Sequence, residues 1–147
     1  MSERHRVAIA VYLVLVDSRG RILLLGRSGT GWEDDRMSLP AGHVEAGESA
    51  MEGMLRECLE EVGVTLRPAN LALRHTMHRH GDPDYVDLYF VATRWAGRPK
   101  LLEPDKANRL EWNDMARLPA NMIPAVAYAI DQIRIGNPYS EYDWPGN

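Results

Sequence analysis

The sequence predicts one domain of the α+β class, in which a mixed β-sheet is covered by helices. Three observations lead to this class. The chain has 147 residues, so residues 1–147 have the size of a single domain. Hydrophobic residues make up 45% and charged residues 26% of it, close to the average of globular proteins. The predicted elements run strand-rich, helix, strand-rich, helix, which fits a mixed sheet better than a regular βαβα winding.

The first third of the chain predicts two strands and a loop. Residues 7–16 are apolar and rich in β-branched side chains, residues 18–20 suit a turn, and residues 21–27 read as a second strand. We therefore expect a hairpin. Residues 28–36 are polar and contain two glycines, which indicates a loop, and residues 37–42 return toward extended structure.

Residues 49–62 carry the clearest helical pattern in the sequence. Ser49 and Glu52 have the spacing of a capping box, and Gly63 stands where a glycine commonly ends a helix. The apolar positions recur at helical spacing and lie on one face: Met51, Met54, Leu55, Cys58 and Val62.

The second half of the chain predicts further strands and one helix. These are strands at 71–80, 85–95 and 110–112, a helix at 123–135, and an irregular tail at 136–147.

Charge and cysteine content exclude several classes of protein. Lys and Arg number 17 against 21 Asp and Glu, a net charge of −4, which argues against a protein that binds duplex DNA by neutralising phosphates. The longest apolar run, residues 7–16, is half a membrane span, and the charged N-terminus lacks the apolar region of a signal peptide. The single cysteine cannot form an intramolecular disulfide. We expect a cytoplasmic protein without a membrane partner.

Three glutamates on the predicted helix suggest a metal site. Glu57, Glu60 and Glu61 are spaced i, i+3 and i+4, so they share a face, where their like charges repel one another and oppose the helix dipole. A hard divalent cation such as Mg²⁺ would offset both penalties. A solvated glutamate face is the alternative.

Residues 42–64 resemble the Nudix box of the Nudix (MutT-like) hydrolases. The pattern of that box is G-x5-E-x7-R-E-U-x-E-E-x-G-U, where U is aliphatic, and every fixed letter is present here. The one departure is Cys58 at an aliphatic position, where it can pack as a small hydrophobe. The matching positions are Gly42, Glu48, Arg56, Glu57, Glu60, Glu61 and Gly63.

The resemblance implies a fold and a chemistry. The fold is an α/β/α sandwich in which the box forms a loop and a helix. The reaction is hydrolysis of a nucleoside diphosphate linked to another group, with water attacking a phosphorus. Glu57, Glu60 and Glu61 would ligate Mg²⁺ or Mn²⁺, the backbone carbonyl of Gly42 could add a ligand, and Arg56 would orient Glu57. Glu57 is also the box residue expected to position or deprotonate the attacking water, although the base can lie outside the box.

Other candidate residues have two readings each. Glu48 could ligate the metal through a water or simply place negative charge at the helix N-terminus. Glu103, Asp105 and Glu111 could supply a further ligand or base, with Glu103 favoured because its loop could reach the site, or they could be solvated charges. Trp32, in the loop before the box, could stack on a base or pack over the sheet edge.

The expected substrate is a small nucleotide, most simply a nucleoside triphosphate cleaved to a nucleoside monophosphate and pyrophosphate. Two alternatives stay open: hydrolysis of nucleotide sugars, and a domain that senses nucleotides without catalysis. The complete glutamate set argues against the second. Assembly as a homodimer is left open.

Overall fold

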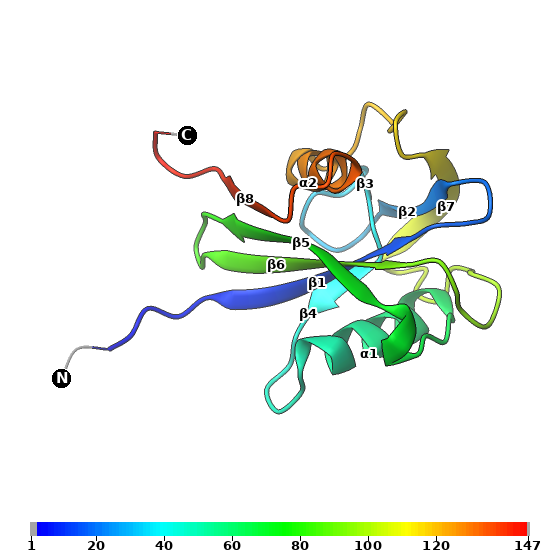
Figure 1. Ribbon diagram of the computed structural model, residues 1–147, viewed down its shortest axis with the longest axis horizontal. Coiled ribbons are helices and arrows are strands. Elements are labelled where there is room, and N and C mark those ends of the chain that lie inside the picture. Colours follow the sequence, from blue (N-terminus) through cyan, green and yellow to red (C-terminus); the bar gives the residue numbers. More distant parts are fainter. Residues whose placement is uncertain (1–2, 147) are drawn as a thin grey trace.

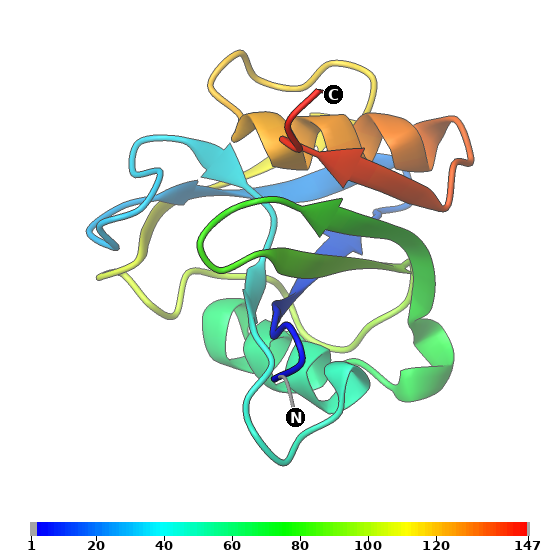
Figure 2. The same ribbon diagram turned by 90° about the vertical axis from the view of Figure 1, so that its left-hand side faces the viewer.

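The computed structural model describes residues 3–146 as an α/β/α sandwich (Figure 1). In order along the chain the strands are β1 (Ala8–Leu15), β2 (Arg21–Arg27), β3 (Met37–Ser38), β4 (Ala41–His43), β5 (Ala72–Arg79), β6 (Tyr85–Ala92), β7 (Ala107–Asp114) and β8 (Tyr139–Tyr142). The helices are α1 (Ala50–Val62), the short 3₁₀ helix η1 (Pro68–Asn70) and α2 (Pro124–Arg134). In Figure 2 the strands lie between α2 above and α1 below. The predicted α+β class is confirmed.

The strands divide between two sheets. The larger sheet has five strands in the order β4-β1-β6-β5-β8, and the smaller has three in the order β3-β2-β7. β1 and β6 run parallel over their full lengths, from Ala8 opposite Tyr85 to Leu15 opposite Ala92. α1 packs on β1 and β4, and α2 packs on β5 and β8. The large sheet therefore has a helix on each face.

The expected hairpin between β1 and β2 is wrong. The turn does form, because Asp17 accepts a hydrogen bond from the backbone N–H of Gly20 and binds Arg21. Beyond it, a single bridge joins Val16 to Ile22. The two strands cannot continue as a ladder because a strand has only two edges, and those of β1 are already occupied by β4 and β6.

The tail is also more ordered than expected. Within the predicted irregular segment 136–147, residues Tyr139–Tyr142 form β8, which pairs parallel with β5. His75 fixes this pairing from β5: its Nδ1 lies 2.7 Å from the carbonyl oxygen of Asn137 and its Nε2 lies 2.7 Å from Ser140 Oγ. The imidazole is buried, so both polar atoms need these partners.

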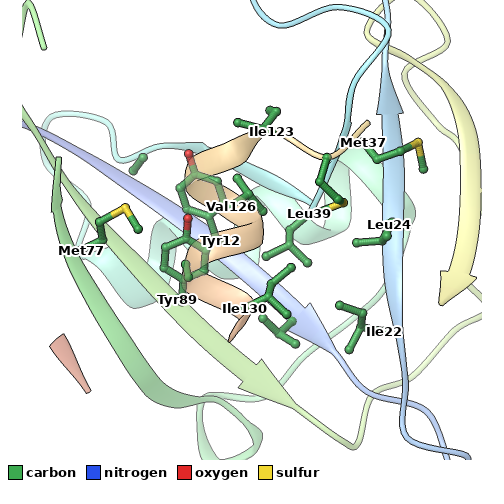
Figure 3. Close-up of a cluster of buried hydrophobic side chains, with 14 residues drawn as sticks. Tyr12, Ile22, Leu24, Met37, Leu39, Met77, Tyr89, Ile123, Val126 and Ile130 are labelled. Carbon is green, nitrogen blue, oxygen red and sulfur yellow. The ribbon is translucent and has the colours of Figure 1, made fainter. Parts of the chain in front are cut away.

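Two apolar cores lie between the layers. One core fills the space under α2, where the stacked rings of Tyr12 and Tyr89 lie beside Val126 and Ile130 (Figure 3). The other lies under α1 and includes Met54, Cys58 and Val62 from the predicted apolar stripe. Neither helix among residues 3–146 is long and apolar enough to cross a membrane.

α1 begins and ends as its sequence predicts. The Ser49 side chain accepts from the backbone N–H of Glu52, whose carboxylate accepts from the Ser49 N–H, so the capping box is complete. Gly63 ends the helix in the left-handed region at φ 70°, a conformation that favours glycine.

Candidate active site

The carboxylates of Glu57 and Glu61 meet the strand β4 at the centre of the candidate site. Both residues lie one turn apart on α1. The backbone N–H of Ala41 donates to Glu61 Oε2 at 2.9 Å. Gly42 passes so close to Glu57 that a Cβ atom there would overlap the carboxylate, so a larger residue at this position would displace the Glu57 side chain.

Burial makes these two carboxylates costly to ionise. It raises the pKa of Glu57 and raises the pKa of Glu61 to about 8, and the nearby Glu57 charge raises the pKa of Glu61 further. Glu103 adds negative charge to the same region and acts on both groups in the same direction. The site therefore concentrates negative charge in a partly dry pocket, which a cation would relieve.

Arg56 binds several of the box residues together. Its guanidinium donates to both oxygens of Glu48, at 2.8 and 3.1 Å, to Glu57 Oε1 at 3.0 Å, and to the carbonyl oxygen of His43 at 3.1 Å. A longer bond of 3.3 Å reaches Glu60. The Arg56 guanidinium lowers the pKa of Glu48 to about 2. Arg56 thus lies where it can orient Glu57, and Glu48 is the residue that holds Arg56 in place.

An acidic cavity of about 720 Å³ opens over these groups. Its lining includes Glu57, Glu61, Glu103, Asp105 and Lys106. The segment before β7 supplies the last three, and Lys106 Nζ lies 3.4 Å from Glu103 Oε2. The loop containing Glu103 thus lines the same cavity as the helix carboxylates.

A second cavity of about 430 Å³, here called the aromatic cavity, adjoins the first. Its lining includes Tyr12, Arg27, Trp32, His43, Arg79 and Tyr85. The two cavities share Arg27, Thr30, Ala41, Gly42 and His43 as lining residues, so they form one continuous depression.

Trp32 lines this aromatic cavity. It is 47% exposed, and the guanidinium of Arg27 lies 4.9 Å from the centre of its ring. Arg27 also donates from Nε to the Trp32 carbonyl oxygen at 2.9 Å and from Nη2 to Thr30 Oγ1 at 2.9 Å. One side of the indole is therefore backed by a fixed cation.

The acidic cavity fits a hard divalent cation. Its donors are the oxygens of Glu57 and Glu61 and the backbone of Gly42, which lines the cavity. Within residues 3–146, no three His, Cys, Asp or Glu side chains stand together as a complete metal cluster. Mg²⁺ commonly takes only one or two carboxylates and fills its remaining positions with waters and substrate phosphates, so the two glutamates suit it.

Several predicted residues lie outside the cavity. The Glu60 side chain is 51% exposed and forms an ion pair with Arg56. Glu48 binds Arg56 and the backbone N–H of Glu45. Glu111 pairs with Arg109 on β7. Direct metal ligation by Glu60 and Glu48 therefore stays a prediction. It requires each glutamate side chain to rotate away from its present hydrogen-bond partners.

Other lining residues were not singled out from the sequence. Arg27, His43, Arg79 and Lys106 come from separate elements and share no spacing or motif. Tyr85 packs against the core under α2 and also lines the aromatic cavity. Only the order of the strands in the two sheets, together with the loop before β7, brings these side chains together.

Comparison with known proteins identifies the family of the chain. The family described as "NUDIX domain" matches residues 5–133. An Escherichia coli (strain K12) protein named 8-oxo-dGTP diphosphatase is 26% identical over 120 residues, which is 81% of this chain and 88% of that protein.

Solved structures extend the comparison to the fold. The MutT NUDIX hydrolase from Burkholderia pseudomallei superimposes with a TM-score of 0.78 and 26% identity, covering 86% of this chain and 98% of that one. The MutT protein from Methanosarcina mazei Go1 also gives a TM-score of 0.78, at 20% identity, with coverage of 92% and 99%. The second likeness concerns the fold alone.

Proposed function

This chain belongs to the NUDIX domain family and is a pyrophosphohydrolase, and on that premise we propose that it cleaves a nucleoside triphosphate to a nucleoside monophosphate and pyrophosphate. The observation that carries the proposal is the continuity of the two cavities. The acidic cavity suits metal-bound phosphates, and the adjoining aromatic cavity suits a base. One nucleotide can fill both.

The roles of the chain's own residues follow from their geometry. Arg56 holds Glu57 Oε1, which leaves the other carboxylate oxygen of Glu57 to accept a proton from the attacking water. Burial raises the pKa of Glu57, which makes it a stronger base than an exposed glutamate. Lys106, in the lining of the same cavity, can bind a phosphate oxygen.

Glu57, Glu61 and the carbonyl of Gly42 would hold Mg²⁺ or Mn²⁺, with Glu60, Glu48 and Glu103 as further candidate ligands. When bound, such a cation neutralises charge on the phosphate oxygens and lowers the pKa of a bound water. The chain's contribution is to place two carboxylates where the diphosphate lies and to keep one of them oriented through Arg56.

Which nucleotide is the substrate is suggested by the name of a relative. The Escherichia coli relative is named for 8-oxo-dGTP, so oxidised guanine nucleotides belong among the candidate substrates. A cytoplasmic location suits a nucleotide substrate and a free buried thiol at Cys58.

The test is a panel of nucleoside triphosphates, oxidised nucleotides and nucleotide sugars with Mg²⁺, in which phosphate, pyrophosphate and sugar phosphates are detected separately. Pyrophosphate released from triphosphates supports the proposal, and the Glu57→Gln variant is the matched control. Release of a sugar phosphate from nucleotide sugars alone would make the chain a nucleotide-sugar hydrolase. Nucleotide binding without turnover of any compound would make it a sensor.

A further inference from the structure

The aromatic cavity has a polarity opposite to that of the acidic cavity. The guanidinium groups of Arg27 and Arg79 supply hydrogen-bond donors to it. The Tyr85 hydroxyl and the His43 ring also line it and share a hydrogen bond of 3.1 Å, in which one donates and the other accepts. No carboxylate side chain among residues 3–146 belongs to its lining. A ligand group that fits here is flat, to suit the aromatic rings, and presents hydrogen-bond acceptors at its edge.

Arg79 is the most rigidly held of these donors. It projects from β5, donates from Nε to Asp87 Oδ2 at 2.7 Å and from Nη2 to Asp87 Oδ1 at 3.1 Å, and is stacked on the Tyr85 ring at 4.3 Å. The Asp87 side chain is only 1% exposed and that of Arg79 is 18% exposed. A bidentate pair and a stacked ring together fix the plane of the guanidinium.

The same contacts leave one edge of the guanidinium available. Arginine has five N–H donors in a planar fork, and Asp87 accepts two of them. No other hydrogen bond of the Arg79 side chain is formed within the described part of the chain. Because Arg79 lines the aromatic cavity, the remaining N–H groups lie where a ligand in that cavity can accept them.

We infer that Arg79, oriented by Asp87 and Tyr85, determines base specificity by selecting purines with a carbonyl group at position 6. Such a purine presents two adjacent acceptors, O6 and N7, which match an arginine fork. An 8-oxopurine carries a proton on N7 and would offer Arg79 the O6 acceptor alone. Adenine presents an amino donor at position 6, which would face another donor. This inference rests on the proposed function, because it places the base of a hydrolysed nucleotide in the aromatic cavity.

The sharpest pair of substrates is inosine triphosphate and adenosine triphosphate, whose bases differ at position 6 and in the N1 proton that accompanies it. Wild type should favour inosine triphosphate in kcat/KM by about 5- to 150-fold, the scale of one bidentate arginine contact. Arg79→Lys keeps a positive charge beside Asp87 but loses the fork, so this preference should fall toward one through a higher KM for inosine triphosphate. Arg74→Lys, the same change at an exposed position of β5, should retain the preference.

Binding of the two monophosphates separates this inference from the hydrolytic function, because neither contains an anhydride to cleave. By calorimetry, inosine monophosphate should bind wild type more tightly than adenosine monophosphate, and Arg79→Lys should remove the difference. That result without turnover of any triphosphate would refute the hydrolase and keep the base site. Equal binding of both by wild type, or an unchanged preference in Arg79→Lys, would overturn the inference.

A measurement on wild type alone covers the case in which Arg79→Lys does not fold. Guanosine monophosphate should bind at least about 5-fold more tightly than its 7-deaza analogue, which lacks the N7 acceptor. Equal affinities would refute the proposed contact.

Discussion

Glu57 combines three features that a structural glutamate does not need. Its carboxylate lies against the backbone of Gly42, where a side chain would displace it, it accepts a hydrogen bond from Arg56, and burial raises its pKa. Glu57→Gln is nearly isosteric and should keep the fold. We predict that it lowers kcat by about 10²- to 10⁴-fold, the scale of a lost general base. Steady-state kinetics with a thermal melt checks this, and undiminished kcat would move the base to another residue, Glu103 being the next candidate.

Cys58 also belongs to the box, but unlike Glu57 it packs in the core and has a structural role. Its thiol is fully buried and lies 3.1 Å from the Val64 carbonyl oxygen, and burial raises its pKa to about 12. Only about one part in ten thousand would be thiolate at pH 8. The native protein should therefore resist thiol reagents at pH 8 and react with one equivalent once unfolded. Rapid labelling of the native protein would show that Cys58 is accessible.

Replacing Cys58 tests the same assignment through stability. Cys58→Ala removes a packed sulfur from the core under α1 and should lower the free energy of unfolding by about 1 to 2 kcal/mol while leaving kcat nearly intact. Denaturant unfolding and kinetics on one preparation measure both. A large loss of kcat with unchanged stability would mean that the faces of α1 have been assigned wrongly.

Among the elements, the loop of residues 28–36 contributes the ring expected to stack on the base. Trp32 lines the aromatic cavity, with Arg27 against its ring. Base stacking is worth about 1 to 3 kcal/mol, so Trp32→Ala should raise KM about 5- to 150-fold, with a smaller change in kcat. Tyr128→Ala, an exposed aromatic on α2, is the control. An unchanged KM in Trp32→Ala would leave base recognition to Arg79 and Tyr85.

The sequence predicted a helix or strand accurately where the residues that define its ends are neighbours in the sequence. α1 differs from its predicted range by only one residue, because the capping box at its start and Gly63 at its end can both be recognised from the sequence. β7 is longer than predicted, running from Ala107 to Asp114, because its ends are polar and depend on pairing with β2 for their assignment. β8 was missed because four residues next to a glycine and a proline carry no strand pattern until β5 and His75 bind them.

Part of the site could be predicted from the sequence and part could not. The spacing of the box identified Glu57, Glu61, Arg56 and Gly42, and the structure places all four together. The aromatic cavity could not be predicted, because its side chains come from five strands and a loop and become neighbours only through the order of strands in the sheets.

For the molecule as a whole, a bound metal should act as a stabiliser. Glu57 and Glu61 are held close together and partly dry in the folded state alone, so a cation binds that state in preference to the unfolded chain. At a free metal concentration of a hundred times the Kd, binding adds about 2.7 kcal/mol to the free energy of unfolding, which corresponds to several degrees in Tm. Millimolar Mg²⁺ should therefore raise Tm, and Glu61→Gln should reduce the shift. Equal shifts in both proteins would place the stabilising cation elsewhere.

The central claim is that the two partly buried carboxylates of Glu57 and Glu61 bring a cation to the diphosphate of a nucleotide. Its most direct test is the amount of nucleoside monophosphate and pyrophosphate formed from the best triphosphate with Mg²⁺ and with excess EDTA. We predict equal amounts of the two products with Mg²⁺ and none with EDTA. Full turnover in EDTA, or products other than this pair, would contradict the account.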